Sequence, residues 1–502
     1  MNNTNIIIPD IPSDYMLDTD PWDSFYINQR YILYALFQAK NWEKTHITLY
    51  DIEESRSLIK ILSNLFSFEN IYIRWISKEY YKPTEEILWT QVDRSLYINT
   101  SWNKLETTLW KIPIDVKKEI INILNGDKTL LLLKSYKITK ETKQIREYLT
   151  ELFEEHNSDN QVILRWENDI EKIEKLWWKS FLHPNINGDY LFPLPDYITN
   201  MIPKGFFVSL DKWKEELPIA LEKLARLWIS KVAIKPVNAS SGEGICFVNL
   251  ENINEFTQDY DFRFGDIIVE EFVNLECMWN IWWLDNIECI KKDPLSISVQ
   301  FIDGKIVWEP TIQLTHENEY IGNILIPSSD IERLGINPDM IANIKKVSHN
   351  LIKMFELDWS WWFDFLIDKE WNPYFIDPNL GRDTGALPSR LMEQLLNNPD
   401  KYIMFSKIPA KNIYNIEIFI EALEKIGINL FDNNNWILPI TLINGEHCTM
   451  VIVWDNLEEV SGIYNKIVET ATNNIYWTEK KQNRDILSNG EKIDYDLLHN
   501  LL

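Results

Sequence analysis

The chain has 502 residues, of which 45% are hydrophobic and 25% charged, and a formal net charge of −26 at pH 7. A chain of this length exceeds what one hydrophobic core supports, so we expect a globular protein of two or three domains. The acidic surplus argues against nucleic acid and anionic membrane as partners, because both would be repelled. A nucleotide can still bind where cations and backbone amides are concentrated locally.

Neither a targeting signal nor a metal-binding cysteine pattern is evident in the sequence. The N-terminal segment lacks a basic region followed by a long apolar run, and no segment reaches the roughly 18 apolar residues of a membrane helix. The four cysteines form no Cys-x-x-Cys pair, and the seven histidines show no zinc spacing. We therefore expect a cytoplasmic protein with reduced, structural thiols.

Short β-rich runs alternate with amphipathic segments through residues 1–195. Strand-like runs lie at 46–50, 71–76, 95–98, 129–133 and 161–165, and helical patterns lie at 55–66 and 140–155. This alternation favours a mostly parallel α/β sheet. A Pro-containing stretch, 184–204, follows and is typical of a linker into a second domain.

Beyond this linker the pattern changes to α/β with longer hairpins, which continues to about residue 400. The last part of the chain predicts helices near 415–426 and 456–471 and strands near 437–443 and 448–453. The sequence therefore predicts an N-terminal α/β domain followed by α+β subdomains. We place the units at 1–195, 196–273, 274–400 and 401–502.

Tryptophan outnumbers glycine by 22 to 15, whereas average usage of about 7% Gly would give roughly 35 glycines. The clearest single case is Trp371, in a short turn between two apolar runs where a tight hairpin needs positive φ. Comparable positions are held by Trp359, Trp361, Trp362, Trp436 and Trp454. We hypothesise that most of these residues are glycine in the native protein, as would follow if the gene reads UGA as glycine. The alternative is a genuine Trp-rich surface that stacks on sugars.

The segment 232–245 reads as a strand, a lysine, a loop of small residues and a second strand. Lys235 precedes the loop, whose central residues are Ser240, Ser241, Gly242, Glu243 and Gly244. Small residues let backbone amides approach a phosphate, and the lysine adds a positive charge beside it. A flexible hairpin with an exposed lysine is the alternative interpretation.

An apolar strand ends in two acids at 266–273. Glu270 and Glu271 precede Phe272 and Val273, and Glu276 follows shortly after. These residues predict a hinge whose backbone pairs with an adenine edge while a carboxylate, with Glu276 as a candidate, accepts a ribose hydroxyl. A solvated strand end is the alternative.

Acidic and amide side chains interrupt two apolar runs within 363–379. Asp377 and Asn379 project from one face of a strand, and Asp364 can lie opposite them on the paired strand. Two carboxylates and one amide oxygen form a cluster suited to Mg²⁺ that bridges nucleotide phosphates. Two unrelated surface acids are the alternative, although buried acids would be costly without a cation.

Taken in order, these three segments resemble the ATP-grasp superfamily, and the resemblance covers roughly residues 200–400. It implies ATP sandwiched between two α+β subdomains that hinge near Val273, with Lys235 and the loop 240–244 on the phosphates. The implied Mg²⁺ ligands are Asp364, Asp377 and Asn379. The flanking regions look like those of peptide-ligase-like members with an extra N-terminal, pre-ATP-grasp domain.

The sequence departs from the superfamily's pattern at several positions. Gly381 stands where many members carry arginine, with Arg382 one residue later, and Asp377 stands where glutamate is commoner. Glu276 lacks the glycine that usually stands two residues before it. A second phosphate-binding lysine, expected upstream, has no clear counterpart, and Lys204 is the nearest candidate.

The resemblance implies an ATP-dependent carboxylate–amine ligase. ATP would phosphorylate a substrate carboxylate and an amine would attack the acyl phosphate, with Lys235 and Arg382 offsetting the negative charge. The partners would be small-molecule carboxylate and amine substrates, and a homo-oligomer is left open. Alternatives are a phosphotransferase or thiol ligase on the same scaffold, or a non-catalytic nucleotide-binding partner protein. No general base is identifiable, because His316 reads as a loop histidine.

Overall fold

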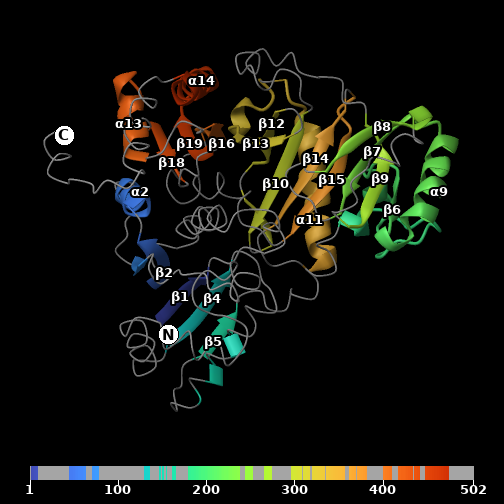
Figure 1. Ribbon diagram of the computed structural model, residues 1–502, viewed down its shortest axis with the longest axis horizontal. Coiled ribbons are helices and arrows are strands. Elements are labelled where there is room, and N and C mark those ends of the chain that lie inside the picture. Colours follow the sequence, from blue (N-terminus) through green and yellow to red (C-terminus); the bar gives the residue numbers. More distant parts are fainter. Residues whose placement is uncertain are drawn as a thin grey trace, which may run out of the picture.

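The computed structural model describes the chain between Asn2 and Asn473, with gaps. The described ranges are 2–8, 44–51, 53–63, 71–77, 129–135, 146–147, 150–151, 154, 161–164, 179–237, 244–252, 265–273, 295–302, 304–307, 309–316, 319–333, 335–356, 361–368, 370–380, 400–409, 416–432, 435–440 and 447–473. They form three β-sheets with helices packed against them, which confirms the predicted α/β and α+β combination (Figure 1). No described helix is long and apolar enough to cross a bilayer.

The first sheet is parallel throughout, as the alternating pattern predicted. Its strands are β1 (Asn2–Ile8), β2 (Lys44–Asp51), β3 (Ile71–Ser77), β4 (Thr129–Ser135) and β5 (Gln161–Leu164), in the order β3-β2-β1-β4-β5, and α2 (Glu53–Ser63) follows β2. The predicted strand at 95–98 lies outside the described residues. The sequence did not predict β1, because its first half is polar, yet β1 is the central strand.

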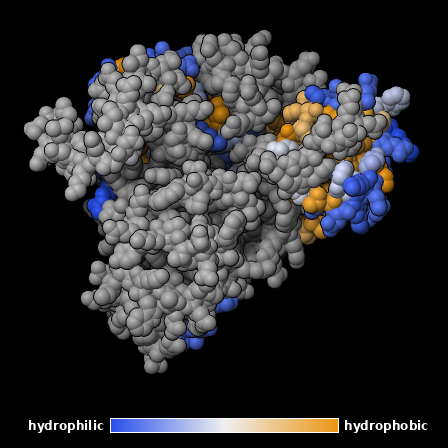
Figure 2. Space-filling model, in the orientation of Figure 1, coloured by the Kyte–Doolittle hydropathy of each residue, from blue (hydrophilic) through white to orange (hydrophobic). Residues whose placement is uncertain are grey.

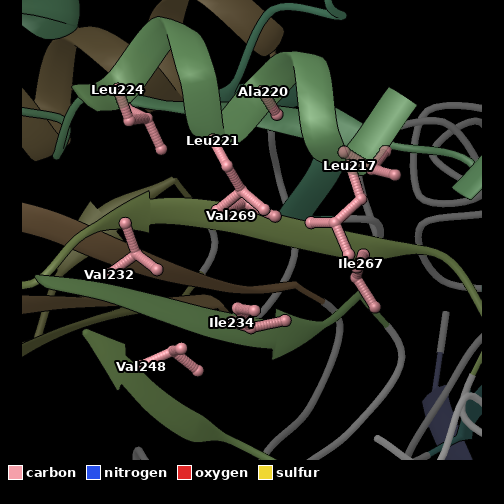
Figure 3. Packing of buried hydrophobic residues seen from close by; sticks show 10 residues of the cluster. Leu217, Ala220, Leu221, Leu224, Val232, Ile234, Val248, Ile267 and Val269 are labelled. Atoms are coloured by element: carbon pink, nitrogen blue, oxygen red, sulfur yellow. The ribbon is translucent and has the colours of Figure 1, made fainter. Parts of the chain in front are cut away.

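A smaller antiparallel sheet follows the linker. Its elements are β6 (Gly205–Val208), β7 (Lys231–Pro236), β8 (Cys246–Asn249), β9 (Ile267–Glu271) and helix α9 (Trp213–Arg226), with strand order β6-β9-β7-β8. Leu217, Leu221 and Leu224 of α9 recur at helical spacing and pack towards Ile267 and Val269 of β9 (Figure 3). The opposite face of α9 is polar, and this subdomain has a hydrophilic outer edge in Figure 2.

The third sheet is the largest, and all its paired strands are antiparallel. Its strands are β10 (Ser296–Ile302), β11 (Lys305–Ile306), β12 (Thr311–His316), β13 (Glu319–Leu325), β14 (Trp361–Ile367), β15 (Pro373–Leu380), β16 (Tyr402–Pro409), β17 (Phe431–Asp432), β18 (Asn435–Pro439) and β19 (His447–Trp454). The path is β15-β14-β10-β12-β13-β16-β19-β18-β17, with β11 paired to β10. The strands after residue 400 therefore continue this sheet across the domain boundary predicted there.

Helices cover the large sheet and connect it to the N-terminal part. They are α11 (Pro338–Phe355), α13 (Ile416–Lys425) and α14 (Leu457–Asn473). Short helices elsewhere in the described chain are η5 (Lys179–Leu182), α8 (Asp196–Thr199), η6 (Leu210–Lys212), η7 (Leu250–Asn252) and η11 (Ser328–Asp330). Helix α2 contacts α13, where Ser57 Oγ donates a hydrogen bond to Glu417 Oε1 at 2.7 Å (Figure 1). The N-terminal α/β unit therefore packs against the C-terminal helices.

Trp371 has φ = 67°, which confirms the expectation of positive φ in this turn. A second tryptophan, Trp228, has φ = 65° and was not predicted. Trp361, Trp362, Trp436 and Trp454 lie within strands and are not among the described non-glycine residues with positive φ, and Trp359 lies outside the described residues. The backbone argument for glycine therefore applies to Trp371 and Trp228, and it does not extend to these strand tryptophans.

Candidate functional site

The candidate site lies where the small sheet approaches the large one. The linker that precedes the small sheet, residues 184–204, binds both sheets through its backbone. Met201 O accepts a hydrogen bond from Phe375 N of β15, and Lys204 O accepts one from Glu271 N of β9, both at 2.7 Å. The predicted hinge strand and the strand with two predicted metal ligands are therefore held in one region of the molecule (Figure 1).

Lys235 of β7 forms a buried ion pair with Glu270 of β9. Lys235 is paired in register with Ile268, two residues from Glu270, so the two polar side chains share one face of the sheet. Lys235 Nζ contacts Glu270 Oε1 directly. His183 Nε2 lies 3.1 Å from the other carboxylate oxygen, Oε2. Glu270 thus has a different partner on each oxygen.

Burial alone would raise the pKa of Glu270, because a desolvated carboxylate resists ionisation. The charge of Lys235 and the hydrogen bond from His183 outweigh this effect and lower the pKa to about 2. Glu270 and His183 are each only 3% exposed, and Lys235 is 9% exposed. The cluster is therefore a desolvated anion with two donors, at the position where the sequence predicted phosphate and hinge contacts.

The hinge residues after Glu270 are tied to neighbouring backbone and side chains. Glu271 Oε1 accepts a hydrogen bond from Lys204 N at 2.9 Å. Phe272 N donates to Lys231 O at 2.9 Å, and Lys231 Nζ lies 3.9 Å from the centroid of the Phe272 ring. Val273 is the last described residue of the hinge and is partly buried.

The predicted acidic hairpin is formed by β14 and β15. Asp364 and Asp377 are directly opposite each other in the antiparallel register, and a bulge follows Asp364. Asn379 Nδ2 donates to Asp364 Oδ2 at 2.7 Å. The structure therefore brings together the two carboxylates and the amide that the sequence placed on facing strands.

Asp364 is only 4% exposed, and within the described residues its Oδ1 has no hydrogen-bond partner of good geometry, although Ser298 and Gln313 lie near the carboxyl group. Burial raises the pKa of Asp364, and the neighbouring charge of Asp377 raises it further, to about 8. A buried carboxyl with an unsatisfied oxygen is unfavourable unless a cation or donor completes it. This orphaned oxygen fits a divalent cation.

The donor set of the hairpin also fits Mg²⁺. It offers two carboxylates and an amide, which are hard-oxygen ligands, and Mg²⁺ commonly completes its shell with phosphates and water. Among the described residues no group of three or more His, Cys, Asp or Glu could hold a metal ion by itself. The hairpin would therefore hold Mg²⁺ together with a phosphate-bearing ligand.

Several predicted site residues lie outside the described part of the chain. They are Ser240, Ser241, Gly242 and Glu243 of the loop, together with Glu276 and Arg382. Gly244, at the end of the loop, is described and has φ = 68°. The prediction that His316 lies in a loop is wrong, because β12 extends to His316, which pairs in register with Glu319 of β13.

Sequence reasoning missed Lys179 and His183, which come from the segment before the linker. Lys179 Nζ lies 3.3 Å from Asp377 Oδ2, and its side chain is 15% exposed. Lys204, the lysine considered from sequence, has an exposed side chain and joins the hinge strand through its backbone. Lys179 is followed closely by Phe181 and Leu182, which are buried. A lysine next to apolar core residues shows no sequence pattern that indicates a functional role.

No protein-family model matches the chain, and no curated protein matches it. Among solved structures, the chain is similar to an L-amino acid ligase from Bacillus licheniformis, with 11% identity and a TM-score of 0.45, over 94% of this chain and 98% of that one. It is also similar to N5-carboxyaminoimidazole synthetase from Staphylococcus aureus complexed with ADP, with 8% identity and a TM-score of 0.44, over 94% and 98% of the two chains.

A third similar structure is the biotin carboxylase–β-γ-ATP complex from Campylobacter jejuni. The identity is 10% and the TM-score 0.41, over 90% of this chain and 87% of that one. These values describe a distant likeness in overall arrangement. Support for a function has to come from the residues of this chain.

Proposed function

We propose that the chain is an ATP- and Mg²⁺-dependent carboxylate–amine ligase that forms an amide through an acyl phosphate and releases ADP. One observation supports this most. A buried lysine–glutamate pair on the small sheet and facing aspartates on the large sheet are linked by one segment, whose His183 contacts Glu270 and whose Lys179 contacts Asp377. The first can bind phosphate oxygens and the second can hold Mg²⁺, so a nucleotide held between the two subdomains would satisfy both.

The nucleotide contacts come from the small sheet and the hinge. Lys235 would bind the α- and β-phosphates, and the loop 240–244 would close over the phosphates with its amides. The amides of Glu271 and Phe272 already donate to Lys204 O and Lys231 O. We therefore assign the adenine edge to the backbone of Val273, and the ribose hydroxyls to Glu276.

Asp364, Asp377 and Asn379 would hold Mg²⁺, which would neutralise charge on the nucleotide phosphates. Lys179 is a better candidate for the second phosphate-binding lysine than Lys204, because its ammonium group already lies beside Asp377. With the carboxylates engaged by a cation, Lys179 would be left to bind a phosphate oxygen.

The reaction would proceed in two balanced steps. A substrate carboxylate oxygen bonds to the γ-phosphorus while the bond from that phosphorus to the bridging oxygen breaks, and ADP leaves. The amine nitrogen then bonds to the acyl carbon, phosphate leaves with the former carboxylate oxygen, and the amine loses a proton to solvent. Lys235, Lys179 and Arg382 offset negative charge, and no covalent side-chain nucleophile is needed.

The experiment is a screen for ADP release with amino acids and dipeptides as carboxylate and amine. The proposal expects release that requires both substrates and Mg²⁺. Asp377→Ala should abolish turnover, whereas Asp211→Asn, which changes an exposed acid in η6, should leave it unchanged. Full activity of Asp377→Ala would remove the metal assignment.

Two other outcomes would replace the proposed reaction. ADP release that requires a hydroxyl or thiol acceptor instead of an amine would indicate a phosphotransferase or a thiol ligase on the same site. Mg·ATP binding without ADP release under any substrate pair would indicate a nucleotide-binding partner protein. Because the nucleotide site would be the same in each case, only the acceptor dependence separates them.

A further inference from the structure

The segment Lys179 to His183 reaches two polar clusters from outside both sheets. Its middle is anchored, because Phe181 and Leu182 are each 1% exposed and the Phe181 ring packs edge-on against Phe355 at 5.5 Å between centroids. Its ends are polar. Lys179 contacts Asp377 on the large sheet, and His183 contacts Glu270 on the small one.

His183 supplies the only described partner of Glu270 Oε2, while Lys235 occupies Oε1. A carboxylate accepts and does not donate, so His183 must carry a proton on Nε2. Without that donor, Oε2 would be buried at a site where the whole residue is 3% exposed. Because an unsatisfied buried oxygen is unfavourable, the Glu270 carboxylate would rotate towards another donor. Its ion pair with Lys235 would then no longer fix the position of Lys235 Nζ.

We propose that His183 is a positioning residue for nucleotide binding: it holds the Glu270 carboxylate in the orientation that places Lys235 Nζ for a phosphate. The inference rests on the proposed function. If His183 were purely structural, its substitution would change stability alone. If it is a positioning residue, its substitution lowers nucleotide affinity in a folded protein, and any side chain that donates a hydrogen bond to Glu270 should preserve that affinity.

The test compares His183→Leu with His183→Gln, whose amide can still donate to Glu270. The dissociation constant for Mg·ATP should rise about tenfold or more in the leucine variant and stay within about threefold of wild type in the glutamine variant. In the reaction with both substrates, the leucine variant should show a raised KM for ATP, while its kcat changes little. His349→Leu, at an exposed histidine of α11, is the matched control.

Thermal unfolding of each nucleotide-free variant identifies any that fail to fold. If the leucine variant does not fold, the glutamine variant still tests the inference. Wild-type affinity in folded His183→Leu overturns the inference, as does equal loss of affinity in the glutamine variant. If wild-type protein does not bind Mg·ATP, the proposed function fails first. The protonation state of His183 in isotope-labelled protein then still tests the contact, and a bare Nε2 contradicts it.

A separate observation concerns Trp228, which follows helix α9. Trp228 N donates to Ala225 O at 2.9 Å and Ile229 N donates to Leu224 O at 3.3 Å. This pair of bonds, with a left-handed residue in the middle, is the helix-ending motif in which that residue is usually glycine. Trp228 has φ = 65° and is 95% exposed, so no packing compensates the strained backbone.

The same chain ends another helix with the same motif and a glycine. After α13, Gly427 N donates to Glu424 O and Ile428 N donates to Leu423 O, both at 2.9 Å, and Gly427 has φ = 80°. Trp371 is the second tryptophan with positive φ, in the turn that joins β14 and β15, where Trp371 N donates to Asp368 O at 3.1 Å.

We infer that Trp228 and Trp371 are glycine in the native protein, inserted at UGA codons. The test reads the two codons in the gene and determines the corresponding peptide masses of protein from its natural source. UGA at both codons and glycine in both peptides is the expected result. UGG at both positions, or tryptophan in the natural peptides, would overturn the inference.

Discussion

Asp364 combines three properties that oppose folding at one residue. It is buried, it faces the Asp377 carboxylate across the hairpin, and its Oδ1 has no hydrogen-bond partner in the part of the chain that the structure describes. Natural proteins keep such groups mainly where a ligand completes them. In the proposed function, Mg²⁺ and nucleotide would satisfy this carboxyl group. Asp364 would therefore lower the stability of the ligand-free protein and favour ligand binding.

Asp364→Asn should therefore stabilise the nucleotide-free protein while it weakens Mg·ATP binding. Removing the buried acid should raise the free energy of unfolding by about 1 kcal/mol, because asparagine is neutral, whereas Asp364 must either bury a charge or take up a proton on folding. Denaturant unfolding without and with Mg·ATP measures both effects. A variant that is destabilised yet binds Mg·ATP normally would show that Asp364 is a structural residue.

Trp371→Gly should also stabilise the protein. A bulky residue in the left-handed region costs roughly 1 kcal/mol or more, and glycine adopts φ = 67° freely. Trp213→Gly is the matched comparison, because Trp213 begins α9 with φ = −55° and packs against the apolar cluster. That variant should lose stability, and a loss of stability in Trp371→Gly would contradict the glycine assignment there.

At the scale of elements, the register between β7 and β9 determines which charged side chains form an ion pair. The register places Lys235 and Glu270 on one face, and burial then strengthens their interaction. Because the pKa of Glu270 falls from its ordinary value of 4.5 to about 2, its carboxylate contributes stability above pH 4.5. That contribution is lost as the pH falls towards 2.

Glu270→Gln should therefore be less stable than wild type at pH 7 by about 3 kcal/mol, the cost of leaving one member of a buried pair alone. The difference should shrink as the pH falls from 4.5 towards 2, since the unfolded chain takes up a proton at Glu270 there while the folded carboxylate stays ionised. Glu222→Gln, in an exposed pair with Arg226, should show little difference at any pH. A difference that is constant with pH would contradict the assigned role of Glu270.

Part of the secondary structure could be predicted from the sequence, for physical reasons that differ between elements. Alternating and continuous apolar runs gave β2 to β5 and the hairpin of β14 and β15, because burial sets their pattern. Strand β1 was missed, since Asn2 to Asn5 carry no apolar signal and its place in the sheet comes from tertiary pairing with β2 and β4.

At the scale of the whole molecule, the site depends on contacts that sequence patterns do not encode. Asp364, Asp377 and Asn379 were predictable because one hairpin carries them. Lys179 and His183 were not, because they reach the site through a segment that is distant in sequence and apolar at its centre. Sequence spacing reveals neighbours on one strand or hairpin, and it does not reveal side chains that come from a segment distant in sequence.

Because the proposed ligand contacts both sheets, Mg·ATP should stabilise the molecule as a whole. At a concentration of about 100 times the dissociation constant, the gain should be about 2.7 kcal/mol. Thermal unfolding with Mg·ATP and with ATP plus a chelator separates the contribution of the ion. An equal shift in both conditions would show that the hairpin of Asp364 and Asp377 does not bind the metal with the nucleotide.

The central claim is the acyl phosphate, and it is tested most directly by the fate of the carboxylate oxygen. The substrate found in the ADP-release screen is prepared with a heavy oxygen isotope in its carboxylate, and the phosphate released with the amine present is analysed by mass spectrometry. Transfer of the label to phosphate is the predicted result. Unlabelled phosphate, released together with the amide, would contradict the proposed mechanism.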